Sequence, residues 1–346
     1  MRISTLLLPA ALLCANGVAQ TESYEVAPVP ADPHELVTGT VTTPKTPADR
    51  ATVLSLLERA RQNADLHMPG APPFQLKISF QAGGNSAYIG SGEMDELWLS
   101  GAKWRYDQRL GEYSETRIGL GGRMFAQLSG SVPMRVEMLR SAMFWPVGTS
   151  TSGNMIRSAS VSWNNRPATC VLASGSTFDG PGRHWGETEF CVDNESGLLQ
   201  IFSRAPGTFA VYGYSKNLQF HGRALPDQIS MYVAGAGVLD AHVTEITDVA
   251  EADATAINPQ PGMNPSVRNM MNMRFPLAPA PISGVEKPVI VHAMIDAQGH
   301  VIEEELSAAA DASLADSALE FVKKSQFGPS AGQREAYIRV QYSSPK

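Results

Sequence analysis

Apolar and polar residues alternate along most of the chain between residues 74 and 249, a period of two that is typical of β-strands with one buried face. Phe74, Leu76, Ile78 and Phe80 show it first, separated by Gln75, Lys77 and Ser79. Further strands are predicted at 88–99, 103–108, 114–118, 123–128, 158–163, 168–173, 185–192, 198–203, 210–220, 228–233 and 242–249. A meander of this length must curl to bury its apolar face.

Two helices interrupt this extended pattern. Thr46 is a good N-cap, followed by Pro47 at the first helical position and Asp49 near the positive end of the helix dipole, and the helix is predicted to run to about Leu66. The second is predicted over Met134–Phe144, where apolar residues recur at helical spacing. We expect it to lie as a lid across one end of the sheet.

The last sixty residues form a separate pattern of two strands, a helix and a strand. Val289 to Ile295 alternates, Asp296 and Gly299 supply a turn, and a second strand follows to Leu306. Ser313 is predicted to cap a helix that ends near residues 323–324. Its apolar stripe comprises Leu314, Ala318, Phe321 and Val322. In the last strand Ala336, Ile338, Val340 and Tyr342 share one face, and Tyr337, Arg339 and Gln341 share the other.

These C-terminal segments, "VIVHAMIDAQGHVIEEEL", "LADSALEFVKKSQFGPS" and "EAYIRVQY", resemble the TonB C-terminal domain family. Residues 314–318 and 325–329 occupy the places of the family's helix and corner motifs, although Ser325 stands where the family has Trp and its Tyr-Pro entry segment is missing. The resemblance implies that this domain engages a periplasmic or outer-membrane protein by strand addition. Tyr337, Arg339 and Gln341 would then lie on the partner-binding edge strand.

A second resemblance covers most of residues 51–249. The order helix, strands, lid helix, strands is similar to the LolA/LolB type of lipoprotein carrier, and "GEMDELWLSGAKWRYDQ", "EFCVDNESGLLQIF" and "NLQFHGRALPDQISMYV" match best. It implies an unclosed antiparallel β-barrel with N-terminal and lid helices. We therefore predict a mainly β protein with an α+β tail, in which the half-barrel holds a lipid or the acyl chain of a lipoprotein.

The chain divides into five parts on this interpretation. We predict a signal peptide at residues 1–19, a flexible leader at 20–46, the half-barrel at 47–249, a Pro-containing linker at 250–284 and the TonB-like domain at 285–346. Cys14 would be lipidated in a lipoprotein, but Leu12 and Leu13 precede it where small residues are expected. We therefore expect Cys14 to be removed with the signal, no transmembrane anchor to be retained, and the protein to be periplasmic or secreted.

With Cys14 removed, Cys170 and Cys191 are the remaining cysteines, and in an exported protein such a pair predicts a disulfide.

The net charge of −7 does not indicate the basic surface that binding of nucleic acid requires. The seven histidines lack metal-site spacing, and no nucleophile elbow or phosphate-binding glycine motif occurs, so we expect no catalytic residues, no metal and no cofactor. The run Glu303–Glu305 is interpreted as a solvated strand edge.

Two functions remain open at this stage, and they are compatible. In the first, the C-terminal domain binds a protein partner through its edge strand during transport across the envelope. In the second, the half-barrel carries an acyl chain. We expect most of its five tryptophans to lie in the core, with the alternative that one or two line the mouth of the cavity. The Met-rich segment 270–275 either packs on a neighbouring domain or offers an adaptable binding patch.

Overall fold

The computed structural model describes residues 28–29, 40–266, 289–309, 312–329 and 334–340, with short gaps inside 40–266 at 69, 85–87, 131, 145, 148–154, 176, 178–182, 185–186, 206–207, 234–235 and 251–254. The predicted signal peptide, Cys14 and the Met-rich segment lie outside the described residues.

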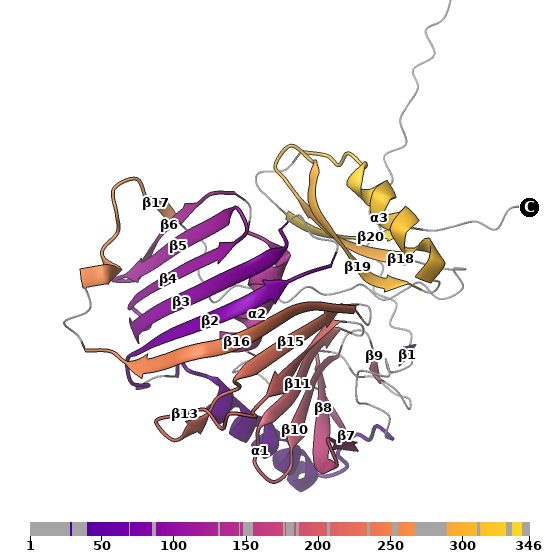
Figure 1. The fold of residues 1–346 in the computed structure, drawn as a ribbon. Helices are drawn as coiled ribbons and strands as arrows, with labels where there is room; N and C mark the ends of the chain where they lie inside the picture. Colours follow the sequence, from indigo (N-terminus) through magenta and orange to yellow (C-terminus); the bar gives the residue numbers. More distant parts are fainter. Residues whose placement is uncertain are drawn as a thin grey trace, which may run out of the picture.

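One curved antiparallel sheet of 13 strands dominates the fold (Figure 1). Its order is β17-β6-β5-β4-β3-β2-β16-β15-β12-β11-β10-β8-β7, so the long β16 joins the first half of the meander to the second. The two edge strands, β17 and β7, do not pair with each other, so the barrel is unclosed as predicted. The strands are β2 (Phe74–Ala82), β3 (Gly90–Ser100), β4 (Lys103–Leu110), β5 (Tyr113–Leu120), β6 (Arg123–Leu128), β7 (Met155–Trp163), β8 (Arg166–Ser174), β10 (Thr188–Asp193), β11 (Leu199–Ala205), β12 (Thr208–Gly213), β15 (Gln228–Val233), β16 (Ala236–Asp248) and β17 (Asn264–Ser266).

Two short strand pairs lie outside this sheet. They are β1 (Pro28–Val29) with β9 (Arg183–His184), and β13 (Gln219–Phe220) with β14 (Arg223–Ala224).

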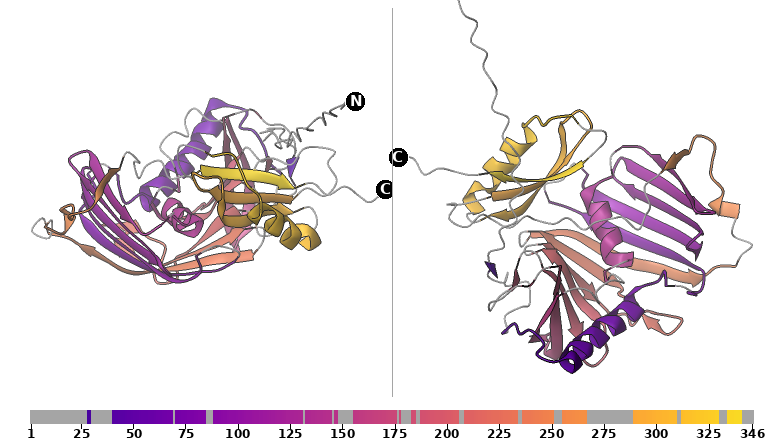
Figure 2. Two further views of the ribbon diagram at one scale, coloured as in Figure 1. Left: turned by 90° about the horizontal axis from the view of Figure 1, so that it is seen from above. Right: turned by 180° about the vertical axis from the view of Figure 1, so that it is seen from behind.

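Two helices lie on the concave side of the curved sheet, which Figure 2 shows from above and from behind. Helix α1 (Pro47–Ala64) begins with the predicted capping box, in which Thr46 Oγ1 accepts from the Asp49 amide at 3.1 Å and Asp49 Oδ2 accepts from the Thr46 amide at 3.1 Å. Helix α2 (Met134–Phe144) has the bounds that its apolar spacing predicted. Both sequence predictions are confirmed.

The C-terminal part is a three-stranded sheet with a helix on one face. Its order is β19 (Val301–Ala309), β18 (Val289–Ile295), β20 (Arg334–Val340), so the first strand in the chain is central. A short 3-10 turn (Ala312–Leu314) precedes helix α3 (Ala315–Lys323). The predicted turn forms, with Gly299 at φ +93°, where an added Cβ would lie 2.0 Å from the Phe327 carbonyl oxygen. Glycine is therefore required at this position.

Two details of the predicted helix were wrong. Ser313 belongs to the 3-10 turn, so the residue at the cap position is Leu314. Leu314 makes no side-chain capping hydrogen bond. Phe321 is 60% exposed, and Leu319 is buried with Ala318 and Val322 against the sheet. Ala318 and Val322 face the sheet as predicted, so the buried stripe differs from the prediction in having Leu319 in place of Phe321.

Part of the segment that we predicted as a linker adds to the large sheet. Strand β17 pairs with β6, the Ala256 carbonyl accepts from Arg105 Nη1 at 3.0 Å, and Ile257 is fully buried. Residues 264–266 therefore extend the edge of the large sheet, and Ala256 contacts Arg105 of β4.

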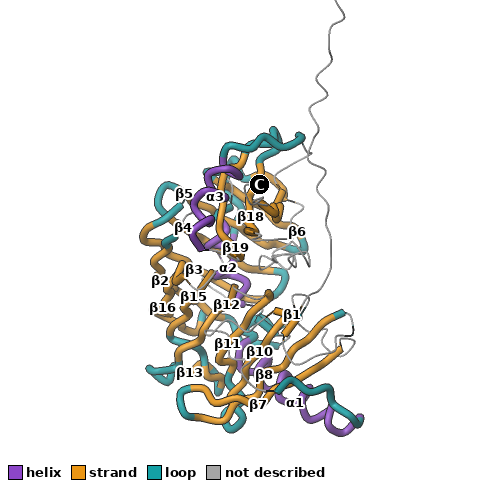
Figure 3. The backbone as a smooth tube through the Cα atoms, turned by 90° about the vertical axis from the view of Figure 1, so that its right-hand side faces the viewer, coloured by secondary structure: helices purple, strands orange, loops and turns teal. Residues whose placement is uncertain are grey.

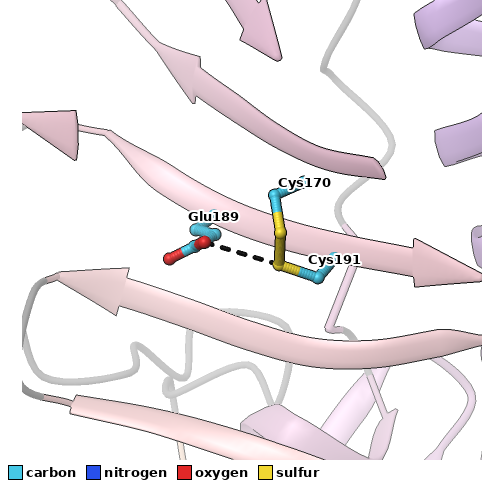
Figure 4. Close-up of side chains that lie close together, drawn as sticks. All are labelled: Cys170, Glu189 and Cys191. Atoms are coloured by element: carbon cyan, nitrogen blue, oxygen red, sulfur yellow. Dashed lines mark hydrogen bonds between the residues drawn. A yellow bond between two sulfur atoms is a disulfide. The ribbon is translucent and has the colours of Figure 1, made fainter. Parts of the chain in front are cut away.

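The predicted disulfide between Cys170 and Cys191 is present (Figure 4). The two residues are directly opposite each other in the pairing of β8 with β10. They belong to an apolar cluster that also holds Leu172, Ile201 and Phe209. This cluster is separate from the main core, which lies on the concave face.

Replacing both Cys170 and Cys191 by Ala should lower the free energy of unfolding by about 3 kcal/mol, since the bond closes a loop of 21 residues. Urea denaturation followed by circular dichroism measures this loss. Dithiothreitol should shift the midpoint of the wild type towards that of the variant and leave the variant unchanged. A wild-type midpoint that does not respond to dithiothreitol would contradict a stabilising role for the disulfide.

Candidate ligand-binding site

The concave face of the large sheet carries the main apolar core. Every second residue of the central strands points into it, including Leu76 and Ile78 of β2 and Ile229 and Met231 of β15, all at most 2% exposed. Leu57 and Ala60 of α1 join the same cluster from one side. The curvature of the sheet thus creates a trough whose walls are apolar along both halves.

Helix α2 fills this trough. All of its eleven residues are buried, a burial that an amphipathic surface helix does not show. Met138, Leu139, Ala142, Met143 and Phe144 are part of the same apolar cluster as the strands. The helix therefore occupies the volume in which an unclosed barrel could hold an apolar ligand.

The N-terminus of α2 is held by the C-terminal sheet. Residue 133 before the helix is a proline and has no side-chain acceptor, and the amide of Met134 instead donates to Glu303 Oε2 of β19 at 3.0 Å. The next residue, Arg135, forms an ion pair with Glu305, and both side chains are at most 5% exposed. The negative charge of both carboxylates is also stabilised by the positive end of the helix dipole.

The interpretation of Glu303–Glu305 as a solvated edge was therefore wrong. The three residues are between 2% and 6% exposed, although β19 is an edge strand. Glu303 and Glu305 lie on the face away from α3, whereas Glu304 accepts from Lys323 at 3.0 Å on the other face. Figure 3 shows the C-terminal sheet next to α2, and the contacts of Glu303 and Glu305 with Met134 and Arg135 account for their burial.

Two further contacts hold the middle and the C-terminus of α2. The Tyr212 hydroxyl of β12 donates to the Ala142 carbonyl at 2.8 Å. Arg140 donates through Nη1 to Glu115 of β5 at 3.1 Å, and its guanidinium carbon lies 3.9 Å from the centre of the Tyr106 ring. A cation over an aromatic face adds electrostatic attraction at such distances.

Arg140 belongs to a group of buried polar residues between α2 and strands β4 and β5. Arg117 also pairs with Glu115 at 2.7 Å, so one carboxylate is shared by two guanidinium groups. Burial raises the pKa of the Tyr106 and Tyr113 hydroxyls well above its usual range, so both stay protonated. Burial alone would lower the pKa of Arg117, but Glu115 outweighs it and raises that pKa. The raised pKa values keep Tyr106 and Tyr113 neutral and Arg117 charged at neutral pH.

The hollows on the convex face have a different chemistry. One of about 690 Å³ is lined largely by charged residues, among them Glu93, Asp95, Arg105 and Asp107. Burial raises the pKa of Asp95, an effect opposed by its hydrogen bond with Gln75. A hollow lined in this way does not suit an acyl chain, because its charges would lose water without gaining partners.

Glu189 approaches the disulfide on the convex side, with Oε1 3.4 Å from Cys191 Sγ (Figure 4). Its other oxygen accepts from Arg183 Nη1 at 2.8 Å. Because the two sulfurs are bonded to each other, the grouping of Cys170, Glu189 and Cys191 is not a metal site in this state.

Of the residues predicted to bind a partner, Tyr337 and Arg339 belong to β20, which is the second edge strand of the C-terminal sheet. Gln341 lies outside the described residues. Of the tryptophans, Trp98 is in the main core and 5% exposed, and Trp163 packs against the disulfide cluster. Trp104 is partly buried against the main core, and Trp145 and Trp185 lie outside the described residues.

The comparisons with known proteins concern the half-barrel. No family model matches the chain, and no curated protein matches it. Among solved structures, a LolA superfamily protein from Nitrosomonas europaea aligns with 14% identity over 57% of this chain and 95% of its own, with a TM-score of 0.35. A putative outer membrane lipoprotein-sorting protein domain from Vibrio parahaemolyticus aligns with 10% identity over 58% and 96%, with a TM-score of 0.36.

A third solved structure, MucB in complex with MucA(peri), aligns with 12% identity over 62% of this chain and 61% of its own, with a TM-score of 0.22. In the described part of the chain, none of the helices has both the length and the apolar character needed to cross a membrane.

Replacing Glu305 by Gln should loosen the C-terminal sheet from α2, because Arg135 then loses the charge of its partner. We expect a loss of about 2 kcal/mol in docking free energy, the size of a hydrogen bond to a charged group. Amide hydrogen exchange at residues 134–137 should rise more than about tenfold. Glu320→Gln on α3, an exposed residue paired with Lys324, serves as the control and should leave this exchange unchanged. Equal exchange in both variants would contradict the docking role.

Proposed function

We propose that this chain is a non-enzymatic binding protein of the cell envelope whose half-barrel carries an acyl chain of a lipid or lipoprotein. The observation that carries the proposal is the complete burial of α2 among apolar side chains of the concave face. The trough is a continuous apolar surface of the half-barrel, and α2, which is not part of the strand ladder, covers it. The signal-like N-terminal residues and the disulfide support an exported protein.

Binding would shift α2 partly out of the trough, and the ligand would take the space that the helix gives up. Each methylene of an acyl chain that leaves water contributes about 0.8 kcal/mol to the binding free energy. A chain that is buried over most of its length therefore offsets apolar burial that α2 loses when it moves. Displacement does not require the sheet to unfold, because α2 is not part of the strand ladder. It does require the contacts with Glu303, Glu305 and Tyr212 to open.

Trp98 provides a probe of the concave side. It stacks on Phe74 with ring centres 5.5 Å apart and lies in the main core. A dibrominated stearate bound in the trough should quench its fluorescence, since bromine quenches tryptophan at short range. The quenching should saturate with ligand and should decrease in Trp98→Phe, in which Trp104 still packs against the same core.

The matched control is Trp163→Phe, because Trp163 packs against the disulfide cluster and not in the trough. This variant should retain the wild-type quenching. If Trp163→Phe lost the quenching and Trp98→Phe kept it, the acyl chain would bind outside the trough and the proposed site would be wrong.

A second candidate function, partner recognition by strand addition, is favoured by the position of β20. In the described residues it pairs with β18 on one side and with no strand on the other. A photo-crosslinking residue at Arg339 should then form a specific protein adduct in cells, whereas one at the exposed Phe321 of α3 should not. Adducts at both positions, or at neither, would count against this function.

A further inference from the structure

Several polar atoms in the group between α2, β4 and β5 have no hydrogen-bond partner among the described residues. They are Nε and Nη2 of Arg140, both amide atoms of Gln108, and the hydroxyl of Tyr106. The three side chains are at most 2% exposed. Buried groups of this kind are normally paired, because an unpaired one forfeits its hydrogen bonds to water.

Arg183, another fully buried arginine, shows what a complete set of partners looks like. Arg183 donates through Nη1 to Glu189 and Ser203, through Nη2 to two carbonyls, and through Nε to the Glu187 carbonyl. Arg140 is buried to the same degree but uses one of its three nitrogens, on Glu115. The fold therefore leaves donors on Arg140 that it does not leave on Arg183.

The three side chains face one another. Tyr106 and Gln108 are alternate residues of β4 on the concave face, and they lie opposite Arg117 and Glu115 of β5. The Arg140 guanidinium lies over the Tyr106 ring. Tyr106 also belongs to the apolar cluster that lines the trough. The unpartnered donors thus lie at the wall of the same trough that we assign to the acyl chain.

Arg140 can leave Glu115 without leaving a buried charge unpaired. Arg117 holds Glu115 Oε2 through both Nε, at 2.8 Å, and Nη2, at 2.7 Å. Glu137, the single carboxylate of α2, has an interaction of its own. When α2 shifts, Arg140 is therefore free to exchange a shared carboxylate for an oxyanion of a ligand.

We propose that Arg140, Tyr106 and Gln108 form a headgroup subsite for a carboxylate or phosphate oxyanion at the end of the acyl chain. This inference rests on the proposed carrier function and specifies its ligand class. Arginine suits this role because its planar fork of donors matches two oxygens of one group. The Tyr106 hydroxyl and the Gln108 amide supply two further donors.

The test compares ligands that share a sixteen-carbon chain. Palmitate and palmitoyl lysophosphatidic acid carry the oxyanion, and hexadecanol does not. Competition with the dibrominated stearate measures the affinity of each ligand for the full chain. We expect the wild type to bind at least one oxyanion ligand about tenfold or more tightly than hexadecanol. The ligand with the larger preference distinguishes a carboxylate from a phosphate site.

Arg140→Gln should reduce this preference to less than about threefold and leave hexadecanol binding intact. Tyr106→Phe, which removes only a hydroxyl, should reduce it partly and tests the subsite if Arg140→Gln does not fold. Arg157→Gln is the matched control, because Arg157 is a buried arginine whose ion pair with Glu187 lies outside this group, and it should keep the preference.

Equal wild-type affinities for the oxyanion ligands and hexadecanol would overturn the subsite while leaving the carrier function in place. The donors of Arg140, Tyr106 and Gln108 would then bind internal water only. A preference retained in both Arg140→Gln and Tyr106→Phe would overturn it as well. Failure of the wild type to bind any of the three ligands would overturn the carrier function together with the subsite.

Discussion

The burial of α2 in the trough is the constraint on which the rest of the structure depends. An unclosed sheet with an apolar concave face is unstable in water unless something covers that face, and here one helix does so along its whole length. The helix itself has charged residues at three of its eleven positions. Each of them must find partners inside the protein, because the helix offers no solvent-facing side.

The partners of these charges come from distant parts of the chain. Arg135 is paired with β19 of the C-terminal sheet, some 170 residues away, and Arg140 with β5 of the half-barrel. Since Glu303 also caps the first turn of α2, the C-terminal sheet stabilises the covered form of the trough. Anything that draws the C-terminal sheet away should therefore make α2 easier to displace, which would connect the two functions that the sequence left open.

The sequence predicted the elements better than it predicted their contacts. The strand meander, the bounds of α2, the capping box at Thr46 and the disulfide all depend on local periodicity or on the cysteine count, and the structure has them. The burial of Glu303–Glu305 was not predictable in this way, because a run of three carboxylates on an edge strand has the same local pattern whether water or another domain covers it. The same holds for Phe321, because helical spacing allows either Phe321 or Leu319 to face the sheet beside Ala318 and Val322, and the structure buries Leu319.

The buried polar group had a weak signal in the sequence. Gln108 and Glu115 occupy positions that the alternation assigns to the concave face, and Arg140 adjoins the apolar Leu139 in a helix predicted to cover that face. No single-sequence pattern shows that these positions meet, because their contact depends on how α2 is placed across β4 and β5. Their lack of mutual partners appears only in three dimensions.

The central claim, that an acyl chain takes up space in the trough that α2 gives up, is tested most directly by amide hydrogen exchange with and without saturating palmitate. The account predicts faster exchange across residues 134–144 in the complex, while the central strands β2 and β15 stay protected. Slower or unchanged exchange across α2, with palmitate shown to be bound, would mean that the ligand lies elsewhere and that α2 is a permanent part of the core.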